Sequence, residues 1–332
     1  MPAPRPARCY RGTPHNLARL ARRLRAGELV AVPTETVYGL AANALDARAC
    51  RKIYTAKGRP RRDPLIVHIH SLAQLAEVAE PNAAALRLAR QFWPGPLTLI
   101  LPRRAAVPAL VSAGLPSVAV RMPSHPLFRR LLRLSGVPLA APSANPFGYV
   151  SPTTAAHVQA GLGRRIRHIL DGGPCAIGLE STIVDVRDPR APRLLRPGAI
   201  TQAALARALG RPVRAARRPA AAAAAQLAPG QLARHYSPRT PVRLHPALAR
   251  AAAARSPADE AWVFLARPAG LAGKNIFWLD ARGRLPGAAR RLFHMLRLLD
   301  GKNFTRLHLE LAPGGGLADA INDRLRRAAA RG

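Results

Sequence analysis

The residues best suited to chemistry occur in five short segments, most of them next to an expected buried strand. The first segment, Pro33 to Leu40, carries hydroxyls, a carboxylate and a phenol directly after the strand expected at Leu29 to Val32. Ligands of α/β proteins bind at strand ends, which makes this segment a candidate binding site. Taken alone, it is also compatible with a polar turn that caps a helix.

The second segment contains two cations, Lys57 and Arg59, on either side of a glycine at the end of an expected helix. Cations spaced in this way can converge on one phosphate group. Lys57 is one of only four lysines in a chain whose other basic residues are arginines, which favours a need for a compact point charge there. The competing interpretation is a solvated basic turn.

The other segments add neutral hydrogen-bonding groups and a further cation. Ser143 and Asn145 follow a short expected strand and offer a hydroxyl and an amide in a turn. Arg121 closes an apolar strand, where a guanidinium is costly unless it pairs with an anion. The fifth segment runs from Gly178 to Asp185 and continues to Arg196 after another short strand.

Together these segments predict a ligand that carries phosphates, accompanied by a carboxylate. The sequence has no Gly-x-x-x-x-Gly-Lys loop, no Gly-x-Gly-x-x-Gly loop and no Gly-x-Ser-x-Gly elbow. It also has no Cys/His cluster of the kind that holds a catalytic metal. His68 ends an apolar strand, where a lone histidine is more typical of the core than of a ligand site.

Alternating apolar runs and amphipathic stretches predict a first α/β or α+β domain around one sheet. Thr13 is the expected N-cap of a helix that places Leu17, Leu20 and Leu24 on one face. We expect further helices at Asp46 to Ala56, His125 to Leu134 and Thr153 to Leu162, and strands at Pro64 to Ile69, Pro96 to Leu101, Ser117 to Met122, Val137 to Ala141, Ile166 to Leu170, Ser181 to Val186 and Arg193 to Leu195.

The composition changes after Leu209. A basic cluster and the alanine run Ala220 to Ala225 predict a linker. A second, smaller α/β pattern follows, with strands at Ala261 to Leu265, Ile276 to Leu279 and Arg306 to Leu311 and helices at Ala288 to Leu299 and Leu317 to Ala330. We therefore expect a first domain at 1–209, a linker at 210–240 and a second domain at 241–332.

The chain has 332 residues and a formal net charge of +35. This charge favours a polyanionic partner, but the excess of Arg, Ala and Pro is equally a feature of GC-rich coding sequence. The three cysteines are scattered and are expected to be reduced thiols. The basic N-terminal segment lacks the apolar core of a secretory signal, and no apolar run spans a membrane, so we expect a cytoplasmic protein.

These segments resemble the YrdC-like family, in its long two-domain form of threonylcarbamoyl-AMP synthase. The likeness extends from about Leu17 to Ile200 and includes a split signature, here Lys57, Arg59, Ser143 and Asn145. The second domain resembles the family's C-terminal extension through His235 to Pro238 and Asp323 to Leu325. The resemblance implies a YrdC-like twisted-sheet domain with helices, joined by a linker to a smaller Rossmann-like α/β domain.

The same resemblance implies a nucleotidyltransferase that condenses L-threonine, bicarbonate and ATP and releases pyrophosphate. The product would pass to a transferase that modifies the adenosine at tRNA position 37. Mg²⁺ would accompany ATP, with no metal bound by the protein itself. The resemblance assigns the catalytic roles to Lys57, Arg59, Ser143 and Asn145, threonine binding to Thr36, His68, Arg121, Ala141 and Ser181, and ATP binding to Arg59, Asp63, Ser117, Ser143, Ser151, Arg196 and Tyr236.

Two positions depart from the family pattern: Asp63 replaces the usual asparagine, and residues 231–233 lack the expected Met, Lys and Tyr. The main alternative function is a module that binds double-stranded or ribosomal RNA without catalysis. Contact with tRNA is compatible with either function. A carbamoyl-transfer enzyme that shares the module would carry a zinc-knuckle region, for which three cysteines are too few.

Overall fold

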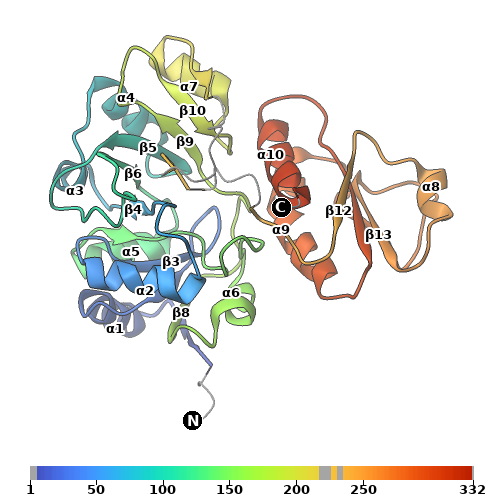
Figure 1. Cartoon of the computed structure of the whole chain (residues 1–332), viewed down its shortest axis with the longest axis horizontal. Coiled ribbons are helices and arrows are strands. Elements are labelled where there is room, and N and C mark those ends of the chain that lie inside the picture. Colours follow the sequence, from blue (N-terminus) through green and yellow to red (C-terminus); the bar gives the residue numbers. More distant parts are fainter. Residues whose placement is uncertain (1–5, 217–225, 230–234, 331–332) are drawn as a thin grey trace.

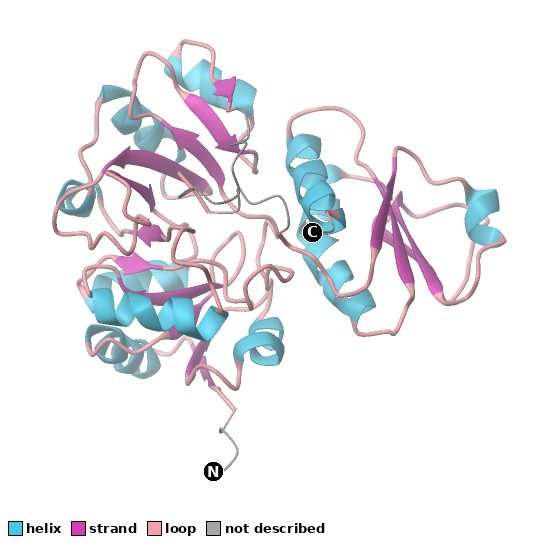
Figure 2. Ribbon diagram, in the orientation of Figure 1, coloured by secondary structure: helices cyan, strands magenta, loops and turns pink. Residues whose placement is uncertain are grey.

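The computed structural model describes residues 6–216, 226–229 and 235–330, which form two α/β domains (Figures 1 and 2). Within these residues, the large domain contains a twisted mixed sheet of 11 strands in the order β1-β8-β2-β3-β7-β4-β6-β5-β9-β10-β11. The small domain contains a parallel sheet of four strands in the order β12-β15-β13-β14. The predicted fold class is confirmed.

The strands of the large sheet are short, and seven helices accompany them in the described residues. The strands are β1 (Arg8–Arg11), β2 (Val30–Val32), β3 (Gly39–Asn43), β4 (Ile66–His68), β5 (Leu97–Pro102), β6 (Ser117–Arg121), β7 (Leu139–Ala140), β8 (His168–Asp171), β9 (Thr182–Asp185), β10 (Arg193–Arg196) and β11 (Arg214–Ala215). The helices are α1 (Pro14–Arg25), α2 (Ala47–Lys57), α3 (Leu72–Val78), α4 (Ala83–Phe92), α5 (Pro126–Ser135), α6 (Ala155–Leu162) and α7 (Gln202–Leu209).

Helix α2 sets the position of the first pair of predicted cations. Asp46 caps its N-terminus by accepting from two backbone amides, as expected for an Asp at this position. The helix ends at Gly58, whose φ of 65° is the left-handed conformation that glycine adopts at little cost. This turn leaves Lys57 and Arg59 at the C-terminal end of α2, both buried.

Strand β3, which pairs antiparallel with β2, was not predicted from the sequence. Its residues, Gly39 to Asn43, are small and mostly apolar. They directly follow the hydroxyl- and carboxylate-bearing residues of the first candidate segment, which begins at Pro33. The segment from 33 to 38 is therefore a loop between two paired strands. Helices α3 and α4 were also missing from the prediction.

The register of neighbouring strands places several polar residues at one level of the sheet. His68 in β4 pairs with Arg121 in β6, and Arg121 pairs with Thr98 in β5. Strand β9, which pairs with β5, begins directly after Ser181. His68, Thr98, Arg121 and Ser181 are far apart in the sequence but therefore lie at the same level of the sheet. Ligand sites of α/β proteins are typically found at such strand ends.

The small domain consists of β12 (Val242–His245), α8 (Arg250–Ala254), β13 (Glu260–Ala266), β14 (Ile276–Asp280), α9 (Leu285–Asp300), β15 (Arg306–Glu310) and α10 (Leu317–Ala329). Figure 1 shows α9 and α10 between the small sheet and the large domain, with α8 on the other side. The core of the small domain includes Val37, Val150 and Leu179 of the large domain, so the two domains share buried surface. None of the described helices is long and apolar enough to cross a membrane.

Gly178 lies at a close approach between the two domains. It has a φ of +81°, and a Cβ at this position would lie 2.5 Å from Cα of Arg290 in α9. Backbone cannot yield as a flexible side chain does, so a larger residue would force the two domains apart.

We predict that Gly178→Ala lowers the melting temperature by at least about 3 °C more than Gly270→Ala does. Gly270 has a similar φ of +69°, but a Cβ there would meet no atom within 4 Å, so it controls for backbone strain alone. Differential scanning calorimetry of both variants makes the comparison. Equal losses would show that Gly178 is not a packing constraint.

Candidate active site

One small cavity brings together most of the residues singled out from the sequence. Its volume is about 40 Å³. Nine predicted residues line it: Thr36, Arg59, His68, Arg121, Ala141, Ser143, Ser181, Arg196 and Tyr236. The other five predicted residues, Lys57, Asp63, Ser117, Asn145 and Ser151, do not line it, and all five are buried.

Arg121 is held between the loop that follows β2 and the segment before β5. Its Nη1 donates to Oγ1 of Thr36 at 2.9 Å, and its Nε donates to the Gly95 carbonyl at 3.2 Å. Its Nη2 lies 2.7 Å from Oε1 of Glu35. Burial opposes ionisation of Glu35, but the adjacent Arg121 outweighs it and lowers the pKa of that carboxyl. A carboxylate ligand would therefore meet a fixed guanidinium that is already partly neutralised.

His68 lies beside Arg121 and is neutral at physiological pH. Burial, reinforced by the charge of Arg121, lowers its pKa to about 3. Its Nδ1 lies 3.2 Å from the Ile66 carbonyl, and the ring also bonds the backbone of Leu139. His68 is thus both a buried residue and part of the cavity wall.

Lys57 joins the two halves of the predicted signature. Its Nζ donates to the carbonyls of Ser143 and Asn145 at 2.6 and 2.5 Å. The Asn145 amide in turn donates to the carbonyls of Pro146 and Tyr149, each at 2.8 Å. Burial, and then the nearby Arg59, lowers the pKa of Lys57 well below its usual value. Lys57 therefore shapes the turn that presents the Ser143 hydroxyl to the cavity.

Arg59 is fixed by the residues that follow it. Its guanidinium donates to the carbonyls of Asp63 at 3.0 Å and Pro64 at 2.6 Å, and it pairs with the Asp63 carboxylate at 3.0 Å. Asp63 is fully buried behind Arg59, and burial raises its pKa despite the neighbouring cations. Asp63 therefore orients Arg59 through this ion pair, although Asp63 does not line the cavity itself.

Arg196 supplies a third guanidinium to the cavity wall. It donates to both the carbonyl and the hydroxyl of Ser181, each at 3.0 Å. The Ser181 hydroxyl also lies 2.7 Å from that of Thr98. Ser117 is placed differently, at the opposite end of β6 from Arg121, and its hydroxyl is buried without a hydrogen bond within the described residues.

Three residues from beyond position 226 close the cavity: Pro229, His235 and Tyr236. Tyr236 is almost fully buried and has a φ of +62°, which is unfavourable for a residue with a Cβ. Ligand sites for drug-sized molecules usually enclose ~300 Å³ or more, far above the volume here. The predicted ATP contact by Tyr236 thus comes from a residue that now fills the site.

Glu180 received no role from the sequence, although it lies in the fifth segment and lines the cavity. Its Oε1 accepts from the Ser151 hydroxyl at 2.5 Å, and its Oε2 accepts from Arg324 at 2.8 Å. Thr34 and His235, in segments also recognised from the sequence, line the cavity as well. An acidic residue directly before Ser181 was the available signal for Glu180, but its partner Arg324 lies 144 positions away.

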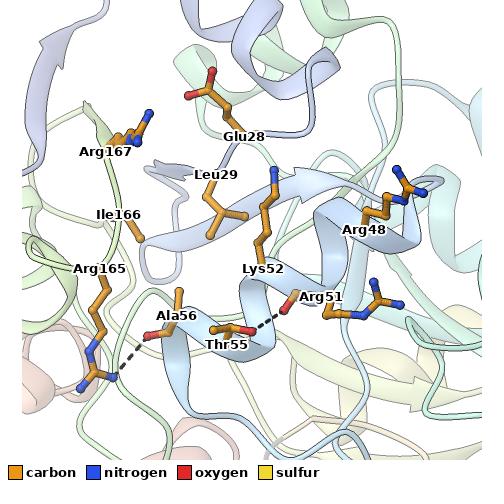
Figure 3. Close-up of a pocket in the computed structure, with 10 residues that line it drawn as sticks. All are labelled: Glu28, Leu29, Arg48, Arg51, Lys52, Thr55, Ala56, Arg165, Ile166 and Arg167. Carbon is orange, nitrogen blue, oxygen red and sulfur yellow. Dashed lines mark hydrogen bonds between the residues drawn. The ribbon is translucent and has the colours of Figure 1, made fainter.

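A second, larger cavity of about 630 Å³ lies away from these residues, between α2 and the start of β8. Figure 3 shows Arg48, Arg51 and Lys52 on one side of it and Arg165 and Arg167 on the other. We refer to this cavity as the basic groove. It shares no lining residue with the site above, and its floor is apolar.

The smaller cavity is better suited to chemistry because its charged groups are buried and fixed. Arg59, Arg121 and Arg196 are each at most 7 % exposed. The hydroxyl of Tyr236, a residue of its wall, is buried and has no hydrogen-bond partner among the described residues. Such atoms are uncommon in native structures and indicate missing partners such as a ligand or water. The described residues contain no His, Cys, Asp and Glu cluster able to hold a metal ion.

The fold and the cavity together define a two-domain α/β protein with a buried cavity lined by three arginines. Comparison with known proteins identifies its family. Residues 22–198 match the Sua5/YciO/YrdC family model, described as telomere recombination, and residues 200–330 match the model described as the threonylcarbamoyl-AMP synthase C-terminal domain. The chain belongs to the Sua5/YrdC family, in its long two-domain form.

Individual relatives agree with this assignment. Threonylcarbamoyl-AMP synthase of Bacillus subtilis is 40 % identical over 329 residues, covering 94 % of this chain and 92 % of that protein. The Pyrococcus abyssi enzyme of the same name is 47 % identical over 224 residues, covering 66 % of this chain and 64 % of that protein. The crystal structure of P. abyssi Sua5 complexed with L-threonine superposes with a TM-score of 0.88 at 37 % identity, covering 97 % of this chain and 96 % of that one.

The shifted pKa of His68 predicts a loss of stability in acid. The folded protein holds His68 neutral down to about pH 3, whereas the unfolded chain binds the proton near pH 6.5, so stability falls as the pH drops below 6.5. Between pH 7 and pH 5 this residue alone should cost about 2 kcal/mol. Urea denaturation of wild type and His68→Asn at both pH values should show a smaller loss in the variant. An identical loss would mean that His68 titrates normally.

Proposed function

We propose that this chain is a threonylcarbamoyl-AMP synthase, which condenses L-threonine, bicarbonate and ATP into threonylcarbamoyl-AMP and pyrophosphate. Its family and its likeness to the B. subtilis enzyme along nearly the whole length of both proteins support this activity. The observation that carries it at the level of residues is the single cavity that Arg59, Arg121 and Arg196 line together. An RNA-binding module without catalysis would not need three buried guanidinium groups around one enclosed cavity.

We assign the threonine side of the site to Thr36, His68, Arg121, Ala141 and Ser181. The guanidinium of Arg121 would receive the carboxylate of the amino acid, and neutral His68 would accept or donate a hydrogen bond without adding charge. The similar P. abyssi Sua5 was crystallised in complex with L-threonine, which supports an amino-acid site in this fold.

We assign the ATP side to Arg59, Asp63, Ser117, Ser143, Ser151, Arg196 and Tyr236, with Lys57 and Asn145 completing the phosphate site. Arg59 and Ser143 line the cavity and would contact phosphate oxygens directly. Lys57 and Asn145 would act from behind by fixing the Ser143 turn. Asp63 would orient Arg59, a role that a carboxylate can perform in place of asparagine.

The reaction needs positioning and charge stabilisation more than acid–base catalysis. The threonine nitrogen and bicarbonate first form a carbamate with loss of water. A carbamate oxygen then attacks the α-phosphorus, the bond from that phosphorus to the bridging oxygen breaks, and pyrophosphate leaves with the electron pair. Buried cations fixed by carbonyls and carboxylates stabilise the charge that develops on the leaving group.

We propose that Mg²⁺ enters as part of the ATP substrate and bridges no ligand set of the protein's own. The cavity must also enlarge before ATP binds, which requires His235 and Tyr236 to move away from the wall. We propose the domain limits 1–209, 210–240 and 241–332, a cytoplasmic location, and transfer of the product to a tRNA-modifying transferase.

We predict that Arg59→Ala lowers the rate of ATP- and threonine-dependent pyrophosphate release by about a hundredfold or more, because a fixed cation at the phosphates is lost. Arg61→Ala is the matched control, since Arg61 is exposed and two positions away. Threonine binding measured by calorimetry should stay intact in both variants and thereby report on folding. Normal pyrophosphate release by Arg59→Ala would contradict the proposed site.

The basic groove favours a further contact with RNA. Three of its guanidinium groups, those of Arg48, Arg51 and Arg167, make no hydrogen bond or ion pair within the described residues. The groove contains one carboxylate, Glu28, which already pairs with Arg23 and His168. We propose that tRNA places its phosphate backbone along this groove.

The double variant Arg51→Glu with Arg167→Glu should weaken tRNA binding about tenfold or more and reduce the salt dependence by about two phosphate contacts. The variant Arg250→Glu with Arg255→Glu changes the net charge equally on the small domain and should bind nearly as wild type. Filter binding at several salt concentrations measures both properties. Equal weakening in the two variants would show that only net charge matters.

A further inference from the structure

The small domain reaches the candidate active site through one buried side chain. Arg324 in α10 has no exposed surface, and both of its interdomain acceptors belong to the large domain. Its Nε donates to Oε2 of Glu180 at 2.8 Å, and its Nη2 donates to the Pro197 carbonyl at 3.0 Å. Glu180 directly precedes Ser181, and Pro197 directly follows Arg196, so Arg324 is fixed to the wall of the cavity.

Glu180 extends this contact to a residue expected to bind ATP. One of its carboxylate oxygens accepts from Arg324, and the other accepts from the Ser151 hydroxyl at 2.5 Å. Helix α9 also contacts the segment that contains Ser151. The side chain of Arg297 in α9 donates to the backbone carbonyls of Val150 and Ser151. The small domain therefore fixes both parts of Ser151. It holds the Ser151 hydroxyl through Glu180 and the Ser151 carbonyl through Arg297.

Arg324 also contacts the residue that closes the cavity. Its guanidinium carbon lies 5.4 Å from the centre of the Tyr236 ring, within the range of a cation–π contact. Tyr236 has a left-handed backbone, which is unfavourable in a residue with a Cβ and is therefore maintained by its surroundings. One turn further along α10, the Arg327 carbonyl accepts from the Ser237 hydroxyl at 3.3 Å.

The threonine side of the site is held in a different way. The polar contacts of Arg121 are with Thr36, Glu35 and Gly95, all within the large domain. His68 contacts the Ile66 carbonyl of its own strand. The small domain thus makes its polar contacts on the ATP side of the cavity and leaves the threonine side to the large domain.

We infer that Arg324 is a positioning residue for ATP, through which the small domain aligns Glu180 and Ser151. The inference rests on the proposed function, because ATP binding on this side of the cavity is itself part of that proposal. Geometry explains why an arginine is required: two separate donors of one planar group satisfy a carboxylate and a carbonyl, and a third pairs with Asp323 at 2.7 Å. A lysine would keep the charge but could not maintain all three contacts.

The test compares Arg324→Lys with Arg326→Ala, an exposed arginine in the same helix. Calorimetry measures the affinity of each folded protein for a non-hydrolysable ATP analogue and, separately, for L-threonine. R324K should weaken binding of the ATP analogue roughly tenfold, as expected for the loss of a hydrogen bond to a charged group, and should leave threonine affinity within roughly twofold of wild type. R326A should match wild type for both ligands.

Glu180→Gln is a second variant of similar shape that removes the charge facing Arg324, and it should show the same selective loss of ATP affinity. Equal weakening of both ligands, or unchanged ATP affinity in R324K and E180Q, would overturn the inference in favour of a purely structural contact. Neither binding measurement needs turnover. A wild-type chain that binds ATP but releases no pyrophosphate would refute the proposed function. The contrast in ATP affinity between R324K and R326A would still decide whether Arg324 positions ATP.

Discussion

Buried positive charge is the constraint on which the rest of this structure depends. Four cationic side chains lose nearly all contact with solvent where the strands of the large sheet meet, and a charge removed from water is costly unless it is paired. Carboxylates and backbone carbonyls in fixed positions accept hydrogen bonds from these side chains. Three of the four side chains also line the cavity. The four cations are Lys57, Arg59, Arg121 and Arg196.

The carboxylates in and around the site each stabilise a different cation. Glu35 pairs with Arg121, Asp63 with Arg59, and Glu180 with Arg324. Each of these cations is thereby oriented before any ligand binds, so the cations themselves need little reorganisation when phosphate and carboxylate charges arrive, although His235 and Tyr236 must move. Preorganisation of this kind is the main contribution that a protein can make to a reaction that transfers a nucleotidyl group.

Both domains are needed to complete this arrangement. The large domain by itself holds the side of the cavity that we propose for the amino acid, through contacts made between neighbouring strands. On the side that we propose for ATP, residues of α9 and α10 reach across the interface to Ser151 and Glu180. The shared core, which includes Leu179 and Tyr236, keeps the two domains in one relative position. The small domain is therefore part of the site as well as a neighbour of it.

Most of the fold and the site could be predicted from the sequence because their signals are local. The Thr13 cap, the apolar face of α1 and the cations around Gly58 all follow from residues within one or two turns. The strand β3 was missed because its small apolar residues directly follow a polar loop. Arg324 could not be predicted as part of the site, since its partner Glu180 is distant in sequence and only the fold brings them together.

The positions of two bound ligands decide whether the buried cations form the active site. The most direct measurement is a crystal structure of this chain with L-threonine and a non-hydrolysable ATP analogue. We predict the threonine carboxylate on Arg121 and the phosphates between Arg59, Ser143 and Arg196, with His235 and Tyr236 displaced from their present positions. Phosphates located in the basic groove, with the cavity near Arg121 still closed, would contradict the central claim.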